Sequence, residues 1–414
     1  MAIIKPFKAV RPKRELAHRV AAPPYDVMDA AEARQMAAGD PYSFLHISRP
    51  EIDLPNDTNL YSEPVYQQGR ENLAAFLRQG ILEQDSQDCY YVYRQQMGSL
   101  TQTGLVACSA VDDYQGGIIR KHELTRADKE EDRVRHIDFL DANDEPVFFT
   151  YRFDPAIARI IAHVTTMVPE YDFTADDNVR HTFWILQNPD EIKRLTELFA
   201  AIPVLYVADG HHRSAAASRV RDIRSSANPA HTGSEEYNYF LTVIFPDSEM
   251  HIMPYNRAVR DLNRLSIAEF MARVAEHFEI TPVSRPVEPP ERHQFGMYLA
   301  GKWYELAARE DSFDAEEPVA RLDVSILQDN LLNSVLGIRN PRTDQRLHFV
   351  GGIRGVEELE RLVESGEYAV AFSLHPTSID ELMELADADR IMPPKSTWFE
   401  PKLRSGLFLH LLGN

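Results

Sequence analysis

The feature that most constrains this chain is a short apolar run that leads through a glycine into a cationic, histidine-rich segment at residues 207–213 (Val-Ala-Asp-Gly-His-His-Arg). The run Val204–Ala208 predicts a buried strand, and the segment His211–Ile223 predicts a helix. Gly210 allows the tight turn between them, since glycine adopts backbone conformations that other residues avoid. Three consecutive alanines keep the predicted helix slim, so it can lie close against a sheet.

Strand-like and helix-like segments alternate along the rest of the chain. Two β-rich segments, Cys89–Gln96 and Thr103–Val111, predict a hairpin turned at Gly98. Ser43–Ile47 is interpreted as a further strand, and Asp190–Ala201 as a helix. Because the two kinds of element interleave throughout, the predicted fold class is α+β, or mixed α/β.

The length of 414 residues predicts two or three domains, each able to bury its own core. A proline-rich stretch, residues 282–290, is the clearest candidate linker. We expect an N-terminal α+β unit at residues 1–115, a central phosphate-binding unit at 116–281 and a C-terminal α/β unit at 291–414.

The charge of the chain restricts its partners. Asp and Glu number 64 against 44 Lys and Arg, a net charge of −20. Such a balance argues against a protein that neutralises a nucleic-acid backbone, so no nucleic-acid partner is expected.

No apolar stretch approaches the roughly 20 residues of a membrane-spanning helix, so no membrane partner is expected either. With only two cysteines and no signal-peptide pattern, the chain is expected in the cytoplasm.

The start of the predicted helix is a candidate phosphate site. The first N–H groups of a helix lack partners within it and attract anions. Gly210 would let a ligand approach, and His211, His212 and Arg213 would add donors. Asp209 is a candidate helix cap, catalytic group or Mg²⁺ ligand. The alternative is an ordinary Asp-Gly turn with solvated side chains.

A second candidate lies in the charged stretch Arg120–Arg135. Glu123 could act as a general base and His122 as a tunable donor beside it. Arg133 is a weaker candidate for a phosphate contact. The alternative is a solvated charged segment, because both signs of charge are dense there.

Two proline-rich turns are candidates for binding a substrate. One, at residues 392–397, could present Lys395 and Ser396, with Lys402 after it, to an anionic ligand, and the other, at residues 22–26, could present Tyr25 and Asp26. Paired prolines supply no N–H groups, so the turn at residues 392–397 is not a glycine-type phosphate loop. Each could instead be a purely structural turn.

The run Ala208–Arg213 resembles the signature of a prokaryotic family known only as domain of unknown function number one thousand and fifteen. Further segments that fit this family span nearly the whole chain: Val20–Val27, Lys121–Glu123 with Arg133, and Met392–Thr397 with Pro401 and Lys402. The turn that opens the helix is also similar, more distantly, to the ParB/sulfiredoxin-like superfamily, which includes kinases of free serine.

This second resemblance implies a central unit of the ParB/sulfiredoxin-like fold, binding ATP or ADP with Mg²⁺. It implies phosphoryl transfer to a small hydroxylated substrate such as serine, with Glu123 similar to the carboxylate that serves as base. Two alternatives stay open: a nucleotide-binding regulator without turnover, and a nucleic-acid-linked protein of the ParB kind. The oligomeric state also stays open.

Overall fold

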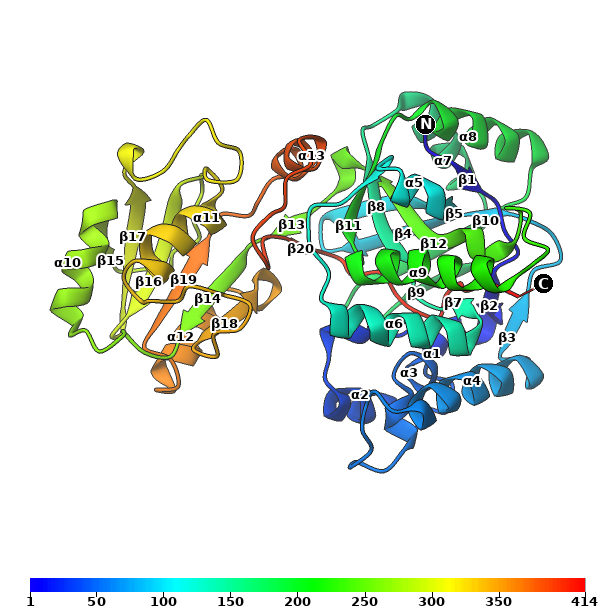
Figure 1. Cartoon of the computed structure of the whole chain (residues 1–414), viewed down its shortest axis with the longest axis horizontal. Helices are drawn as coiled ribbons and strands as arrows, with labels where there is room; N and C mark the ends of the chain where they lie inside the picture. Colours follow the sequence, from blue (N-terminus) through cyan, green and yellow to red (C-terminus); the bar gives the residue numbers. More distant parts are fainter. Residues whose placement is uncertain (414) are drawn as a thin grey trace. The chain divides into compact units, whose positions relative to one another are not determined.

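The computed structural model describes residues 1–413, which divide into two compact units (Figure 1). Unit 1 comprises Met1–Met250 and the segment from Pro401 onward, and unit 2 comprises His251–Glu400. In sequence terms, unit 2 is therefore an insertion between the two parts of unit 1.

Unit 1 is built on one mixed sheet. Its strands in spatial order are β6 (Ile119–Arg120), β11 (Leu205–Asp209), β8 (Val147–Tyr151), β12 (Tyr239–Pro246), β5 (Leu100–Ala110), β4 (Tyr90–Met97), β10 (Arg180–Leu186) and β9 (Tyr171–Thr174). Strand β1 (Ile4–Lys5) pairs with β5. The predicted hairpin is confirmed, because β4 and β5 pair antiparallel around Gly98. The predicted mixed α/β class is also confirmed, since β8 pairs parallel with β12 and antiparallel with β11.

This sheet explains why the chain does not divide as expected. The predicted boundary at residues 115 and 116 separates β4 and β5 from β8, β11 and β12, yet all five strands belong to one hydrogen-bonded sheet. The proline-rich residues 282–290 lie inside unit 2, after β15 (Phe278–Val283), rather than between units. Strand pairing between segments far apart in sequence joins what composition suggested were separate domains.

Helices pack on the sheet of unit 1 and on one another. They are α1 (Ala17–Val20), α2 (Ala30–Ala37), α3 (Leu45–Ser48), α4 (Glu63–Arg78), α5 (Val111–Gln115), α6 (Ala127–Leu140), α7 (Pro155–Val164), α8 (Pro189–Ala201) and α9 (His211–Ala227). Helix α9 contacts β8 and β12, α6 packs on α9, and α4 packs on α6. Ala216 and Ala217 are buried on α9, as expected for a slim helix close to a sheet.

Two short ladders complete unit 1. Strand β2 (Val10–Pro12) pairs with β3 (Leu82–Gln84), and β7 (Ala142–Asn143) pairs with β21 (His410–Leu411). The second ladder attaches the C-terminal segment to the chain just before β8. The last part of the sequence is thereby fixed within unit 1.

Unit 2 has its own sheet, with strand order β15, β17 (Lys302–Ala308), β16 (Gln294–Leu299), β19 (Val370–Leu374), β14 (Tyr255–Val259) and β18 (Leu347–Gly351). A further pair joins β13 (Ile252–Met253) to β20 (Trp398–Phe399). The helices of unit 2 are α10 (Ile267–His277), α11 (Asp323–Leu327), α12 (Glu357–Glu364) and α13 (Ile379–Asp387). Leu359 and Leu362 of α12 enter a core with Ala258, Tyr298 and Ala371 of the sheet.

One prediction on local structure was wrong, and so was one of the alternatives. Ser43–Ile47 is not a strand, because its second half belongs to the helix α3. The charged stretch Arg120–Arg135 is not simply a solvated segment, since most of it forms α6, whose Val134 and Ile137 pack with Ala216 and Val220 of α9. Within residues 1–413 no helix has the length and apolar character needed to cross a membrane.

Candidate functional site at the start of α9

The turn between β11 and α9 is the centre of the candidate site. β11 ends at Asp209, Gly210 has φ of +96°, and α9 begins at His211, which confirms the predicted strand, turn and helix. A Cβ atom on Gly210 would lie 3.1 Å from Arg213 Nε and 3.2 Å from Val147 Cγ1. Glycine is therefore required here both by the positive φ and by the close approach of two side chains.

Arg213 is buried beneath this turn. One terminal nitrogen donates to the carbonyl of Pro146, while Arg213 Nε has no hydrogen-bond partner among residues 1–413. Burial lowers the pKa of Arg213, but the facing acids Asp26, Asp209 and Glu145 outweigh this effect and raise it. The guanidinium stays charged, with one N–H still able to serve a ligand.

His211 and His122 lie against each other. Their rings meet edge to face with centroids 4.5 Å apart, and both side chains are buried. Within the described chain, His211 Nε2 and His122 Nδ1 have no hydrogen-bond partner. Burial lowers the pKa of His122 to about 4, and burial together with His122 holds the pKa of His211 well below its usual range. Both rings are therefore neutral at pH 7, so each brings a donor or an acceptor and no charge.

His212 lies on a more exposed side of the same turn. Its Nε2 accepts a hydrogen bond of 3.0 Å from the backbone N–H of Arg126. In the neutral ring the proton then belongs to Nδ1, which is a donor. The structure thus joins the start of α9 to the segment that opens α6.

Asp209 is held between two cations. Its Oδ2 lies 2.9 Å from Lys402 Nζ, and its Oδ1 lies 3.9 Å from a terminal nitrogen of Arg213. Burial opposes ionisation, but Lys402 and Arg213 outweigh it and hold the pKa of Asp209 well below its usual range. Asp209 is not the cap of α9: the cap residue is Gly210, whose N–H donates to Asp209 Oδ1 over 2.7 Å.

These contacts bear on the expected metal role of Asp209. Across residues 1–413, no group of three or more His, Cys, Asp and Glu side chains is placed to hold a metal ion. A magnesium ion needs about six oxygen ligands, and one carboxylate that is already paired with Lys402 supplies few of them. The residues present do not form a Mg²⁺ site by themselves.

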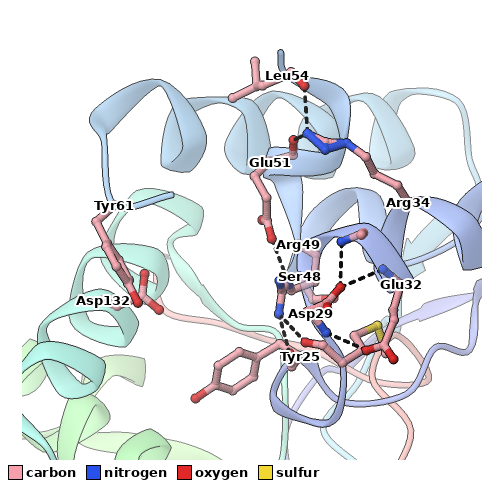
Figure 2. Close-up of polar contacts among 12 residues, drawn as sticks. Tyr25, Asp29, Glu32, Arg34, Ser48, Arg49, Glu51, Leu54, Tyr61 and Asp132 are labelled. Carbon is pink, nitrogen blue, oxygen red and sulfur yellow. Dashed lines mark hydrogen bonds and ion pairs between the residues drawn. The ribbon is translucent and has the colours of Figure 1, made fainter. Parts of the chain in front are cut away.

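Tyr25 and Asp26 lie beside the same turn. The Tyr25 ring is stacked by the Arg133 guanidinium, 4.0 Å from its centroid, and the charge of Asp26 acts on Arg213. Figure 2 shows how the Tyr25 backbone is fixed: its carbonyl accepts a hydrogen bond of 2.7 Å from Arg49. Three of the predicted residues thus gather around Arg213.

A buried acid that sequence reasoning missed completes this cluster. Glu145 Oε1 accepts hydrogen bonds of 2.9 Å from the Tyr25 N–H and the Ser405 hydroxyl. Its Oε2 has no partner in the described part of the chain. Burial, with Asp144 beside it, raises the pKa of Glu145 to about 7. Nothing in the local sequence marked Glu145, because its partners come from segments 120 and 260 residues away.

Glu145 lines a small cavity with the two buried arginines. The walls include Arg133, His136, Asp144, Glu145, Val147 and Arg213. Arg133 forms hydrogen bonds of 3.0 and 2.8 Å with Asp132, and Asp144 lies 2.9 Å from His136 Nε2. The cavity therefore has ion pairs on one side and the start of α9 on the other.

Three further predicted residues belong to other segments of the chain. Glu123 is half-buried and follows His122 directly. Lys395 and Ser396 belong to unit 2, where Lys395 lies over the Tyr255 ring and the Ser396 hydroxyl donates to the Pro393 carbonyl over 2.6 Å. Their substrate-binding role stays a prediction.

The arrangement suits an anionic oxygen ligand. The start of α9 supplies backbone N–H groups and the positive end of the helix dipole. Arg213 and Lys402 add two positive charges, and His211 adds a buried nitrogen without a partner in residues 1–413. A phosphate group fits this donor set, since it offers several strong acceptors and a compensating charge.

Comparison with solved structures gives eight chains that match. A free serine kinase in complex with AMP is 13% identical, with a TM-score of 0.34, and the match covers 74% of this chain and 91% of that one. SbnI with C-terminal truncation from Staphylococcus aureus is 12% identical, with a TM-score of 0.39, covering 74% and 87%. A conserved hypothetical protein from Pyrococcus furiosus is 13% identical, with a TM-score of 0.36, covering 74% and 95%.

Sequence comparison gives a clearer result. No curated protein matches the chain. One family, described as "Protein of unknown function (DUF1015)", matches residues 4–325, which is more than three quarters of the sequence. The chain belongs to this family.

Proposed function

We propose that this protein is a nucleotide-dependent phosphotransferase, which moves a phosphoryl group from ATP or ADP to the hydroxyl of a small molecule such as free serine. The observation that carries the proposal is the start of α9, where buried Arg213 and His211 each retain a nitrogen without a partner among residues 1–413. A buried polar atom without a partner costs free energy, and a bound phosphate would remove that cost.

The proposed phosphate site comprises Gly210, His211, His212 and Arg213. A Cβ on Gly210 would crowd Arg213, so glycine lets the Arg213 side chain lie close to the backbone at the start of α9. Arg213 would donate Nε–H to a phosphate oxygen while its terminal nitrogen stays on the Pro146 carbonyl. Arg133 supports the site indirectly, through the ring of Tyr25.

The chemistry asked of the protein is limited. Phosphoryl transfer depends on positioning, on neutralising charge and on a group that accepts the hydroxyl proton. Glu123 is the proposed acceptor of that proton, with His122 beside it as a neutral donor or acceptor. The acceptor oxygen forms a bond to the terminal phosphorus as the bond to the nucleotide breaks, which leaves ADP or AMP. A magnesium ion, when bound, would neutralise phosphate charge, and its ligands would come mainly from phosphate oxygens and water.

The acceptor is proposed to contact Tyr25 and Asp26, beside the turn at the start of α9. Asp26 is exposed beside Arg213 and could pair with an ammonium group. A free amino acid carries an ammonium group, which supports serine as the substrate to test first.

The direct test is product formation. The purified protein is incubated with ADP or ATP, Mg²⁺ and L-serine, and phosphoserine is followed by ³¹P NMR. We expect a phosphoserine signal that depends on both nucleotide and serine. A folded protein that neither binds nucleotide by calorimetry nor yields product would contradict the proposal.

A matched pair of variants on α9 tests the phosphate site. Arg213→Lys keeps the charge but loses the planar fork, and should weaken ADP binding by about tenfold. Arg219→Lys changes a half-buried arginine on the same helix, which pairs with Glu130 and Glu131, and should leave ADP affinity unchanged. Equal ADP affinity in the two variants would refute the assignment of Arg213.

Glu123→Gln separates an enzyme from a regulator without turnover. The amide keeps the shape of the side chain but cannot accept the hydroxyl proton, so we expect turnover to fall about 100-fold or more with nucleotide affinity retained. Nucleotide binding without any product in the wild-type protein would favour the regulator instead.

A further inference from the structure

Lys402 reaches the candidate site from the far end of the chain. The polypeptide leaves unit 1 at Met250, returns at Pro401, and places Lys402 Nζ 2.9 Å from Asp209 Oδ2. The two residues are 193 positions apart, and the side chain of Lys402 is 20% exposed. This lysine therefore joins the turn at the start of α9 with an ammonium group that still meets solvent.

Two buried glutamines fix the backbone of Lys402. Gln95 Nε2 donates to the Lys402 carbonyl over 2.7 Å, and Gln102 Nε2 donates to the Pro401 carbonyl over 3.1 Å. The glutamines face each other across β4 and β5 and share a hydrogen bond of 2.9 Å. Because both glutamines belong to the central sheet, the backbone at Lys402 is attached directly to β4 and β5.

The charges around Asp209 suit a ligand better than an isolated ion pair. Lys402 and Arg213 approach opposite oxygens of the Asp209 carboxylate, and the positive end of α9 begins one residue later. Lys402, Arg213 and the start of α9 thus bring positive charge to one place, where Asp26 and Glu145 also face Arg213. An ammonium group has three N–H donors, so it can serve more than one acceptor at a time.

We propose that Lys402 is a further phosphate-binding residue of this site, and that Asp209, Gln95 and Gln102 are its positioning residues. The inference rests on the proposed nucleotide function. It gives Asp209 the role of holding Lys402 beside Arg213, in place of a metal ligand or a base. The ligand class is a nucleoside diphosphate or triphosphate, whose added charge a second cation would favour over a monophosphate.

The experiment uses the full chain and two matched variants, Lys402→Met and Lys5→Met. Lys5 also pairs with an acid in unit 1, at 2.7 Å from Glu236, and its exposure of 24% is close to that of Lys402. ADP affinity is measured by calorimetry at low and high ionic strength. We expect Lys402→Met to weaken ADP binding about tenfold and to flatten its dependence on salt, and Lys5→Met to do neither.

Conservative variants separate a ligand contact from a structural effect. Lys402→Arg keeps the positive charge and should recover most of the ADP affinity, whereas Lys402→Gln keeps a hydrogen-bond donor without charge and should not. Melting temperatures show which variants are folded. If Lys402→Met or Lys402→Gln is folded and binds ADP like the wild type, the inference is overturned and the proposed function stands. If the folded wild type does not bind ADP, both are overturned.

Discussion

At the scale of single residues, the candidate site is a set of buried charges that balance one another. Arg133 is balanced by Asp132, and Arg213 by the acids that face it. Removing one partner of such a pair costs more than the pair itself contributes, because it leaves an isolated charge in the interior. Glu145 differs from the rest, since burial and Asp144 favour its neutral form.

The protonation of Glu145 predicts a dependence of stability on pH. Its pKa is about 7 in the folded protein, against an ordinary value of 4.5. Between these values the folded state holds a proton that the unfolded chain has lost, so this group lowers stability as pH rises through the window. Above about pH 7 both states are ionised, and the contribution no longer changes.

Glu145→Gln should remove this dependence while keeping an acceptor for the Tyr25 N–H. Relative to the wild type, we expect the free energy of unfolding of the variant to rise between pH 5 and pH 7, by up to about 1.4 kcal/mol per pH unit. Urea titrations at several pH values measure it. A difference that is constant with pH would show that Glu145 is ionised in the folded state throughout.

At the scale of elements, the turn between β11 and α9 was the most predictable part of the molecule. Its apolar strand, glycine and alanine-rich helix are all local in sequence, and each has a local physical cause. The charged helix α6 was less predictable, because its buried face is defined only by its packing against α9. Local pattern identified the elements, and contact between elements decided their buried faces.

The turn makes a prediction of its own. Gly210→Ala places a Cβ at a positive φ and within 3.1 Å of Arg213, so we expect a loss of about 1–3 kcal/mol in the free energy of unfolding. ADP binding should weaken as well, since Arg213 must move. Gly117→Ala is the control, because Gly117 has φ of +76° and a Cβ there meets no described atom within 4 Å. Equal losses in both variants would mean that only φ matters.

At the scale of the whole molecule, the division into two compact units predicts two unfolding transitions. Each unit has its own sheet and its own hydrophobic core. Calorimetric scans should resolve both transitions, with ADP raising only that of unit 1, where the proposed phosphate site lies. Leu359→Ala, in the core of unit 2, should lower the free energy of unfolding of unit 2 by about 2–5 kcal/mol and leave the transition of unit 1 unchanged. One cooperative transition that shifts as a whole in both experiments would contradict this independence.

The sequence by itself determined the mixed α/β class, the family, and the strand, turn and helix that carry Gly210 and Arg213, because each depends on nearby residues or on motifs along the chain. Only the tertiary structure decided that β4 and β5 share a sheet with β11, and that Glu145 and Lys402 join the site. These depend on contacts between residues up to 260 positions apart. Such contacts follow from which surfaces bury one another, and no local pattern records that.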